Sequence, residues 1–497
     1  MSFTPGPAER VPEARPPVDY SRVARVHLMG IGGSAMGNFA GMLQARGLEV
    51  RGSDAGVFDP MRSNLLKWSI PFCEGYAAAN LDWQPDLVIV GNVIRRDNPE
   101  ATSLRERGLP YTSFPESLGE WLLEDRIPVV VTGTHGKTTT TALTTWLLEA
   151  NGMSPGLLIG GVPVNLGKSF QQGAGRPFVI EGDEYDTAYY DKRPKFVHYK
   201  PHHAILTSIE FDHADIYPDF AAVSRAFRLL ASLVHPDGQL CAWGEDQRVL
   251  DVLDACRAKV VRYGIAGAGH ELDAEAEMVS MGPAGTCFDL RLDGKKVARF
   301  QSPMAGQHNV RNAVAALATV LNLGVSTQGA VDALATFRGI KKRQEIRGIV
   351  DDIVVIDDYA HHPTAVRETV AAIRDCYPGQ KLWALFEAES NTSRRRVFQD
   401  AYPDAFQVAD EVIFCSPLIK DSDKLGADQQ LDVSNMVENI KRAGTPARYI
   451  PEVDTIVDVV AKEARSGDVI LAMSGRNFRG LHDALLARLS KRTAETT

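Results

Sequence analysis

The residues with the clearest chemical meaning lie between Val129 and Thr141, where an apolar run ends in a turn that contains glycine, lysine and threonine. The run predicts a buried parallel strand, and residues 142–150 predict a helix directly after the turn. Backbone N–H groups in such a turn and the positive end of the following helix bind phosphate groups. Lys137 would reach the β and γ phosphates of a nucleotide, and the Thr138 hydroxyl would bind Mg²⁺. We therefore predict a loop that binds a nucleoside triphosphate, formed by Gly133, Thr134, His135, Gly136, Lys137, Thr138 and Thr139.

This loop departs from the general P-loop pattern in one respect, because Val131 stands where that pattern has its first glycine. We interpret the loop as a shortened variant. A strand, turn and helix with an incidental lysine is the alternative. The β-branched strand before the turn, and the helix that ends at Asn151 and Gly152, favour nucleotide binding instead.

Carboxylates suited to a magnesium ion follow the next buried strand, predicted at residues 178–180. The segment 181–186 reads Glu-Gly-Asp-Glu-Tyr-Asp, and Mg²⁺ prefers carboxylate oxygens beside phosphates, so one of these acids is the predicted metal ligand. A solvated acidic turn is the alternative. Farther along, Asp212 and His213 follow a strand predicted at residues 204–206. This pair would bind a second metal or orient a substrate, or it would only cap a helix.

A second glycine-rich turn stands near the start of the chain. The strand predicted at residues 23–29 is followed by Gly-Ile-Gly-Gly-Ser-Ala-Met-Gly and by a helix to about Arg46. Gly30 and Gly32 would allow a diphosphate to approach the backbone closely, Ala35 would take the third position of the pattern, and Asp54 would accept a hydrogen bond from a ribose or a base. Such turns also serve only to pack a helix on a sheet. Asn92, past the strand at residues 86–90, lies where open α/β sheets bind ligands.

The C-terminal part repeats the alternation of strands and helices. Residues 306–312 lead into a helix of small residues, and their amide side chains would read an adenine edge or cap the helix. A basic cluster at residues 337–348 is typical of a solvated linker. Strands predicted at residues 353–356, 382–386, 411–414 and 469–473 then follow, and acids and histidines stand just past the first of them, at residues 357–362.

These patterns together predict an α/β fold with three domains. The N-terminal and C-terminal domains would be Rossmann-like, and the central domain would be a parallel sheet of the P-loop ATPase type. The predicted boundaries are a flexible tail at residues 1–22, an N-terminal domain at 23–126, a central domain at 127–338 and a C-terminal domain at 339–497.

Composition narrows the class of protein. The 54 basic and 63 acidic residues give a net charge of −9 without a long run of either sign, which argues against a nucleic-acid surface. The six cysteines are scattered without a Cys-x-x-Cys pair, as in a reducing cytoplasm. We recognise neither a signal peptide nor a run of about 18 apolar residues that would insert in a membrane.

Taken together, the motifs resemble those of the ATP-dependent Mur ligases of peptidoglycan synthesis. In chain order they are Thr-Gly-Thr-His-Gly-Lys-Thr, Glu-x-Asp-Glu, Asp-His, Gly-x-His-Asn-x-x-Asn and Asp-Asp-Tyr-Ala-His-His-Pro, and the resemblance extends from about Val23 to Leu489. It implies a cytoplasmic ligase, a monomer or weak dimer, that uses ATP as a substrate and Mg²⁺ as a cofactor. Its partners would be UDP-N-acetylmuramate and a peptide or L-alanine, and the product would be an amide formed through an acyl phosphate.

Within the family, residues 185–199, 390–392 and 473–482 are most similar to members that add the tripeptide L-alanyl-γ-D-glutamyl-meso-diaminopimelate in peptidoglycan recycling. Members that add L-alanine share the core motifs and remain the main alternative. They are expected to carry Pro-His-Arg-Tyr near position 390, which is absent from this chain.

The resemblance implies a role for each matching position. Together with the strand-end residues, it places the UDP sugar at Gly30, Gly32, Gly33, Ser34, Asp54 and Asn92. Besides the phosphate-binding loop, ATP would contact His308, Asn309, Asn312, Arg343 at its γ-phosphate and Asp358 at its ribose. Thr138, Glu181 and His213 would bind metal, and the catalytic set would be Lys137, Glu181, His213, Arg343 and His361. His361 or His362 would orient the incoming amine or take its proton, and the peptide would contact Tyr185, Ser390, Asn391 and Thr392.

Several positions depart from the family pattern. Gly182 replaces an alanine, and Ser208 stands where relatives have asparagine. Glu387-Ala388-Glu389 replaces Glu-Pro-Arg, which reverses a charge near the expected peptide site, and the run 475–480 adds two arginines to a glycine-rich segment. Phe227 occupies the place of a carbamylated lysine found in some members, so that metal bridge should be missing.

Two other classes of protein are alternatives. A nicotinamide-dependent oxidoreductase would use the first glycine-rich turn, but it has no need of a P-loop followed by an acidic cluster. A non-catalytic sensor of peptidoglycan precursors would have no need to retain Lys137, Glu181, His213 and Arg343 together.

Overall fold

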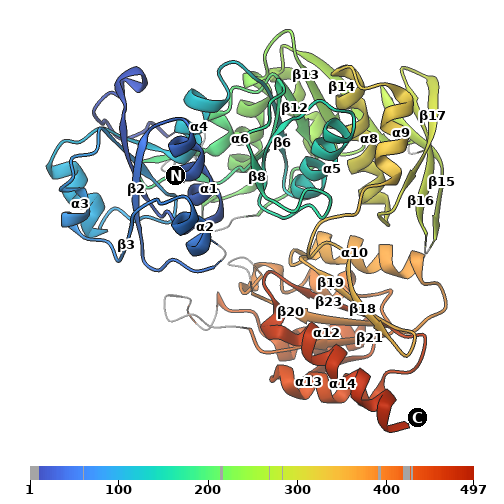
Figure 1. Ribbon diagram of the computed structural model, residues 1–497. Coiled ribbons are helices and arrows are strands. Elements are labelled where there is room, and N and C mark those ends of the chain that lie inside the picture. The colour runs from blue at the N-terminus through green and yellow to red at the C-terminus, as the bar shows by residue number, and fades with distance from the viewer. Residues whose placement is uncertain are drawn as a thin grey trace, which may run out of the picture. The chain divides into compact units, whose positions relative to one another are not determined.

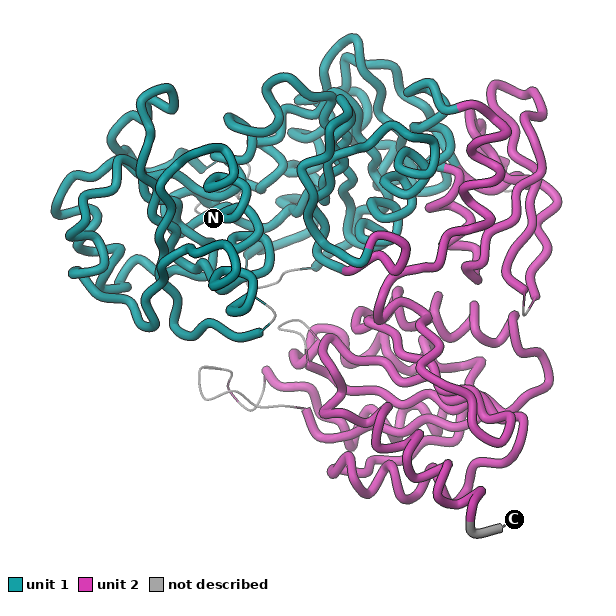
Figure 2. Tube along the Cα trace, in the orientation of Figure 1, with its two compact units in different colours: residues 1–161, 167–263, 315–325 teal, residues 162–166, 264–314, 326–497 magenta. Residues whose placement is uncertain are grey.

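The computed structural model describes residues 10–59, 61–212, 216–267, 269–282, 284–389, 393–417, 426 and 429–496. The predicted site residues His213, Ser390, Asn391 and Thr392 lie outside these ranges. The chain forms two compact units (Figure 2). Unit 1 comprises residues 1–161, 167–263 and 315–325, and unit 2 comprises residues 162–166, 264–314 and 326–497.

The first part of unit 1 is a five-stranded parallel sheet (Figure 1). Its strands are β1 (Arg25–Met29), β2 (Glu49–Asp54), β3 (Phe72–Glu74), β4 (Leu87–Val90) and β5 (Tyr111–Ser113), in the order β3-β2-β1-β4-β5. Its helices are α1 (Ser34–Ala45), α2 (Met61–Lys67), α3 (Pro99–Glu106) and α4 (Phe114–Leu122). The strand order reverses between β1 and β4, and open α/β sheets bind ligands at the carboxyl ends of such strands. The glycine-rich turn after β1 lies at this point.

The second part of unit 1 is built on parallel strands around β6 (Ile127–Thr132). The others are β7 (Gly156–Leu158), β8 (Phe170–Gln171), β9 (Pro177–Gly182), β12 (His203–Leu206), β13 (Gln239–Trp243) and β14 (Lys259–Ile265), in the order β14-β13-β12-β6-β9-β7-β8, with only β8 antiparallel. The helices are α5 (Lys137–Ala150), α6 (Phe220–Leu233) and α7 (Gln247–Leu250), and a hairpin joins β10 (Asp186–Ala188) to β11 (Asp191–Pro194). Because β6 lies between β9 and β12, loops from all three strands meet at one edge.

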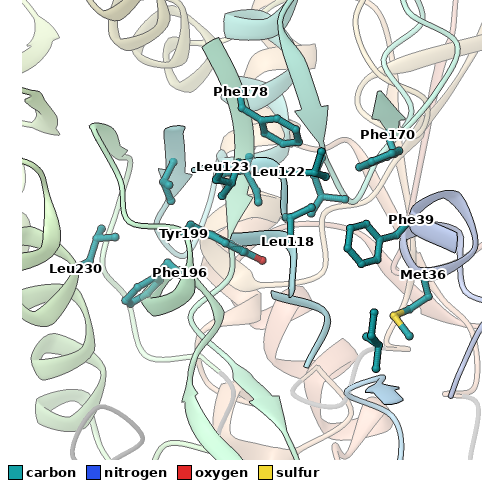
Figure 3. Close-up of a cluster of buried hydrophobic side chains, with 14 of the residues drawn as sticks. Met36, Phe39, Leu118, Leu122, Leu123, Phe170, Phe178, Phe196, Tyr199 and Leu230 are labelled. Carbon is teal, nitrogen blue, oxygen red and sulfur yellow. The ribbon is translucent and has the colours of Figure 1, made fainter. Parts of the chain in front are cut away.

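A single apolar cluster packs the two parts of unit 1 together. Phe39 of α1 and Leu118 of α4 belong to the same cluster as Phe178 of β9 and Leu230 of α6 (Figure 3). Phe39, Leu118, Phe178 and Leu230 are all 0 % exposed, so the cluster excludes water where the two parts meet. The two sheets of unit 1 therefore share one core.

Residues 10–22, which were expected to belong to a flexible tail, make side-chain contacts with unit 1. Arg15 forms an ion pair with Glu116 and donates a hydrogen bond of 2.6 Å to the Tyr111 carbonyl. Tyr20 meets the edge of Trp121, with ring centroids 5.2 Å apart.

Unit 2 contains three antiparallel strands, which belong to the same ten-stranded sheet as β14, and a six-stranded mixed sheet, which is the larger sheet formed within this unit. Strands β15 (Ala274–Gly282), β16 (Gly285–Leu292) and β17 (Lys295–Ser302) pair in sequence. Helix α8 (Gln307–Asn322) begins in unit 2, its residues from 315 on belong to unit 1, and α9 (Thr327–Ala335) lies in unit 2. The larger sheet has the order β18-β19-β23-β20-β21-β22, with only β18 antiparallel. Its strands are β18 (Glu345–Val350), β19 (Ile353–Asp358), β20 (Leu382–Glu387), β21 (Glu411–Phe414), β22 (Ala447–Tyr449) and β23 (Val469–Ser474).

Helices cover both faces of this larger sheet, as expected for a Rossmann-like domain (Figure 1). The helices are α10 (Pro363–Cys376), α11 (Tyr402–Ala405), α12 (Val433–Arg442), α13 (Val453–Glu463) and α14 (Leu481–Thr496). One apolar cluster joins the sheet to α10 and α12, and another joins it to α13 and α14. The predicted α/β class with three parallel-sheet domains is thus confirmed. Within the described residues, none of the helices combines the length and the apolar character that crossing a membrane requires.

One buried histidine in unit 1 makes stability depend on pH. Burial and the neighbouring His202 lower the pKa of His203 to about 4. The unfolded chain, with a histidine pKa near ~6.5, therefore takes up this proton first as the pH falls from about 7 to about 5, and stability decreases over that range. His203→Asn is expected to recover roughly 1–2 kcal/mol of the loss. The measurement is the difference in Tm between the two pH values. The exposed His270 provides the control His270→Asn, and an equal effect of both variants would contradict the prediction.

Candidate active site

The predicted phosphate-binding loop runs from the end of β6 to the first turn of α5. Gly133 has φ of +130° and Gly136 has φ of +81°, which is a backbone region that glycine adopts at little cost. A Cβ atom at position 133 would lie 2.2 Å from Thr207 Oγ1 and 2.7 Å from the Ser208 nitrogen. Glycine is therefore required here for a second reason, because the loop packs directly against the segment after β12.

Lys137 is the first residue of α5, and its side chain folds back over the loop. Its Nζ donates hydrogen bonds of 2.6 Å to the Gly133 carbonyl and 2.9 Å to Glu184 Oε2. Burial acts against its charge, but the carboxylates of Glu184 and Asp183 outweigh burial and raise the pKa of Lys137. The loop thus contains a buried, charged ammonium group, as binding of a γ-phosphate requires. The pairing with Glu184 was not anticipated from the sequence.

Thr138 and Glu181 lie together, as expected for two magnesium ligands. The Thr138 hydroxyl donates a hydrogen bond of 2.8 Å to Glu181 Oε1, and the Gly160 N–H donates one of 2.7 Å to Oε2. Burial, together with the charge of Asp183, raises the pKa of Glu181. A cation beside this carboxylate would relieve that cost, and a hydroxyl with a carboxylate is an oxygen donor set that Mg²⁺ prefers. The residues present therefore fit a magnesium ion.

The segment after β12 supports the other side of the loop. Ser208 accepts a hydrogen bond of 2.9 Å from the His135 N–H through its hydroxyl, and its carbonyl accepts one of 2.9 Å from the Thr134 N–H. His135 Nε2 lies 3.0 Å from Glu210 Oε2. Ser208, which departs from the family pattern, therefore holds the loop, and so does Glu210, which was not predicted. The predicted metal pair of Glu181 with His213 remains a prediction, because His213 lies outside the described residues.

The glycine-rich turn after β1 is shaped by Asp54 at the end of β2. Asp54 Oδ2 accepts a hydrogen bond of 2.8 Å from the Gly32 N–H, and a Cβ atom at position 32 would lie 2.9 Å from the same oxygen. On the other side, the Gly91 N–H donates a hydrogen bond of 3.0 Å to the Met29 carbonyl, which places Asn92 just past the ends of β1 and β4. This close-packed backbone matches the turn that was predicted to approach a diphosphate. That a UDP sugar binds to this turn stays a prediction.

Unit 2 brings together the residues predicted to hold the adenosine part of ATP. His308, Asn309 and Asn312 lie in the first turns of α8, and Asn309 Nδ2 donates a hydrogen bond of 2.7 Å to the Ala305 carbonyl. Asp358, at the end of β19, accepts hydrogen bonds of 2.7 Å from the Ala360 N–H and 2.8 Å from the Gln344 N–H.

Electrostatic effects link these residues to Arg343. Burial raises the pKa of Asp358, and the Arg343 guanidinium opposes that rise. Burial also lowers the pKa of His308, so this ring is kept neutral. The Arg343 guanidinium lies 4.7 Å from the centre of the Tyr359 ring, close to the strand end that carries Asp358. Three segments far apart in the sequence therefore converge on one place in unit 2.

The two histidines before α10 differ in their contacts. His362 is the N-cap of α10, and its Nδ1 accepts a hydrogen bond of 3.3 Å from the Thr364 N–H. His361 Nδ1 lies 2.9 Å from the Tyr359 carbonyl, which can only accept, so Nδ1 carries the proton and Nε2 is the basic nitrogen. His361 is therefore the better candidate for a proton acceptor. Among the predicted peptide contacts, Tyr185 has the Lys195 ammonium 4.0 Å from its ring centre.

Three family models match consecutive parts of the chain. Their descriptions are "Mur ligase family, catalytic domain" at residues 25–126, "Mur ligase middle domain" at residues 131–320, and "Mur ligase, glutamate ligase domain" at residues 342–476.

Individual proteins match over nearly the whole chain. The UDP-N-acetylmuramate–L-alanyl-gamma-D-glutamyl-meso-2,6-diaminoheptandioate ligase of Escherichia coli K12 is 38 % identical, over 94 % of this chain and 99 % of its own. The crystal structure of a murein peptide ligase from Psychrobacter arcticus matches with a TM-score of 0.67 and 34 % identity, covering 94 % of this chain and 98 % of its own. A UDP-N-acetylmuramate-alanine ligase from Thermotoga maritima matches with a TM-score of 0.73 and 24 % identity, over 95 % of this chain and all of its own, which supports the fold alone.

Proposed function

This chain belongs to the Mur ligase family, and we propose that it joins UDP-N-acetylmuramate to the tripeptide L-alanyl-γ-D-glutamyl-meso-diaminopimelate with the conversion of ATP to ADP and phosphate. The observation that carries the choice of peptide is the 38 % identity, end to end, with an Escherichia coli ligase named for that tripeptide. The L-alanine-adding alternative has less support. The ligase with that name from Acetivibrio thermocellus is 30 % identical over 92 % of this chain, and the one from an Arthrobacter strain is 37 % identical but over 79 % of this chain. Neither the oxidoreductase nor the sensor alternative is supported, because all three matching models describe ligase domains.

The proposed reaction proceeds in two steps. The lactyl carboxylate of UDP-N-acetylmuramate attacks the γ-phosphorus of ATP, which forms an acyl phosphate and releases ADP. The peptide amine then attacks the acyl carbon, the amide bond forms, and phosphate leaves. A carboxylate is a poor acyl donor, and the phosphate activates it by giving it a good leaving group.

The chain's own residues supply charge and proton transfer for these steps. The Lys137 ammonium, held in the loop by the Gly133 carbonyl and Glu184, is placed to bind the transferred phosphate. Arg343 would add a second positive charge from unit 2. Mg²⁺ bound by Thr138 and Glu181 would supply positive charge beside the phosphates. His361, with its basic Nε2, would take the proton that the attacking amine loses.

The proposal is tested by omitting one component at a time. Steady-state ADP formation should require UDP-N-acetylmuramate and the tripeptide together, and mass spectrometry should detect the amide product with the loss of one water. ADP formation of equal rate without the sugar nucleotide would contradict the proposal. As the resemblance to the family implies, we place the enzyme in the cytoplasm, as a monomer or weak dimer, and size-exclusion chromatography with light scattering tests the oligomeric state.

Substrates should also compact the protein. The phosphate-binding loop belongs to unit 1, and Asp358 and Arg343 belong to unit 2. The resemblance assigns both sets to one ATP, so we infer that substrate binding closes the protein and excludes the water that hydrolyses an acyl phosphate. We expect the radius of gyration from small-angle scattering to fall when a non-hydrolysable ATP analogue and UDP-N-acetylmuramate are added. An unchanged radius at saturation would contradict closure.

A further inference from the structure

Two glutamate-arginine pairs lie at the carboxyl edge of the larger sheet in unit 2. β20 ends at Glu387 and β23 ends at Ser474, and these two residues are register partners in neighbouring strands. Past the ends of the strands, Glu387 Oε1 lies 2.9 Å from Arg479 Nε, and Glu389 Oε1 lies 2.8 Å from Arg476 Nε. Three of the four residues, Glu389 and the two arginines, depart from the family pattern.

The side chains of Glu387 and Arg479 both form further hydrogen bonds within the fold. Glu387 is 0 % exposed, and its second oxygen accepts a hydrogen bond of 2.7 Å from the Ser474 hydroxyl. Arg479 also donates a hydrogen bond through Nη2 to the Ser416 carbonyl. Each side chain of this pair thus has a second hydrogen-bond partner within the fold, which is typical of a structural ion pair.

The pair of Glu389 and Arg476 is arranged differently. The side chain of Glu389 is 5 % exposed, whereas that of Arg476 is 58 % exposed. Within the described part of the chain, the Arg476 guanidinium has one acidic partner, the Glu389 carboxylate near Nε, and neither Nη1 nor Nη2 forms a side-chain hydrogen bond. The buried carboxylate attracts the guanidinium to this edge of the sheet, and the two terminal nitrogens of a guanidinium match the two oxygens of a carboxylate.

The position of Arg476 points to the amine substrate. Asp358, predicted to bind the ATP ribose, is the register partner of Met473 on the other side of β23, so Arg476 follows the strand end beside it. The proposed tripeptide carries free carboxylates on its glutamyl and diaminopimelyl residues. It therefore needs a cation at this edge, where Glu389 has replaced the arginine of the family pattern.

We propose that Arg476 binds a carboxylate of the incoming peptide through Nη1 and Nη2, and that Glu389 is the positioning residue that holds its guanidinium. The charge that is missing at position 389 is then supplied from position 476. This inference rests on the proposed function, because it takes the amine substrate to be an acidic peptide.

The test combines an enzyme variant with a substrate variant. ADP formation is measured at saturating ATP and UDP-N-acetylmuramate, with the tripeptide or its C-terminal amide as the varied substrate. Arg476→Gln should raise KM for the tripeptide by about 10-fold to 100-fold with kcat nearly unchanged, the range expected for a hydrogen-bonded charge pair made equally in ground and transition states. If the bound carboxylate is the terminal one, the amide should lose affinity with the parent enzyme and much less with Arg476→Gln. The same comparison with the glutamyl carboxylate amidated, and with the second diaminopimelyl carboxylate amidated, covers the other two cases.

Control variants separate binding from structure. Arg479→Gln should lower Tm because it leaves Glu387 buried without its cation, while the parent's discrimination between acid and amide peptides is retained. Glu389→Gln should reduce that discrimination and raise KM by a smaller factor than Arg476→Gln. Arg476→Lys keeps the positive charge but lacks the two parallel donors of a guanidinium, so it should bind the tripeptide more tightly than Arg476→Gln and less tightly than the parent.

The outcomes are distinct from those that test the proposed function. A parent enzyme that prefers L-alanine would overturn the choice of peptide, and the acid-amide comparison would then be made with L-alanine and alaninamide. If Arg476→Gln changes KM equally for the tripeptide and for each of its amides, or changes none of them, the role of Arg476 is overturned.

Discussion

Replacing Lys137 by alanine is expected to lower the rate of ADP formation by ~100-fold or more at saturating ATP, because removing a preorganised cation from a transferring phosphoryl group costs a few kcal/mol. The structure supplies the reason for so large an effect. The ammonium group is held in the loop by the Gly133 carbonyl and by Glu184, so the Lys137 side chain loses little conformational entropy when ATP binds. The measurement is kcat from a coupled assay for ADP.

Two controls make this result specific. Lys200→Ala removes a lysine whose side chain is 71 % exposed and should leave kcat unchanged. The double variant Lys137→Ala/Glu184→Gln removes the charge that the single variant would leave buried, and should have the parent's Tm while remaining inactive. A rate for Lys137→Ala within about threefold of the parent would show that the loop does not bind the transferred phosphate.

The second large effect concerns the metal. Glu181→Gln keeps the size of the side chain and its contact with Thr138 but removes the charge that binds Mg²⁺. We expect kcat to fall by about 100-fold or more and the Mg²⁺ concentration for half-maximal rate to rise by at least about 10-fold. The assay is a magnesium titration at fixed total ATP.

The matched control is Glu149→Gln, near the other end of α5, where the carboxylate lies 3.3 Å from Gln171 Nε2. It should change neither kcat nor the magnesium requirement. An unchanged magnesium requirement in Glu181→Gln would contradict the assignment of this residue as a metal ligand, even if kcat fell.

The local parts of the site were predictable because they depend on residues close together in the sequence. The loop from Gly133 to Thr139 joins a β-branched strand to a helix, and that pattern alone indicates phosphate binding. Glu181 was predictable as well, because β9 pairs with β6 and any acid at its carboxyl end must lie near the loop.

The contacts between distant segments were not predictable in the same way. Glu184 was seen only as one of several acids, and its pairing with Lys137 depends on how the chain turns after β9. Ser208 and Glu210 looked like departures or neutral positions, yet both hold the loop through hydrogen bonds with Thr134 and His135. Such pairs are set by tertiary packing, to which no periodicity in the sequence corresponds.

The changed charge at Glu389 shows the same limit. In the sequence it reads as the loss of a cation, and the added Arg476 reads as an unrelated change 87 positions later. In the fold the strands that precede them, β20 and β23, are neighbours, and the two side chains form one ion pair. Both departures are visible in the sequence, but only the order of the strands in the sheet shows that the two side chains lie together.

The central claim is the choice of amine substrate, and a direct comparison of kcat/KM tests it. ADP release is measured with one preparation of the parent enzyme, at the same saturating ATP and UDP-N-acetylmuramate, with either L-alanyl-γ-D-glutamyl-meso-diaminopimelate or L-alanine varied. We predict a higher kcat/KM for the tripeptide, together with an amide product of the corresponding mass. An equal or higher kcat/KM for L-alanine would contradict the account.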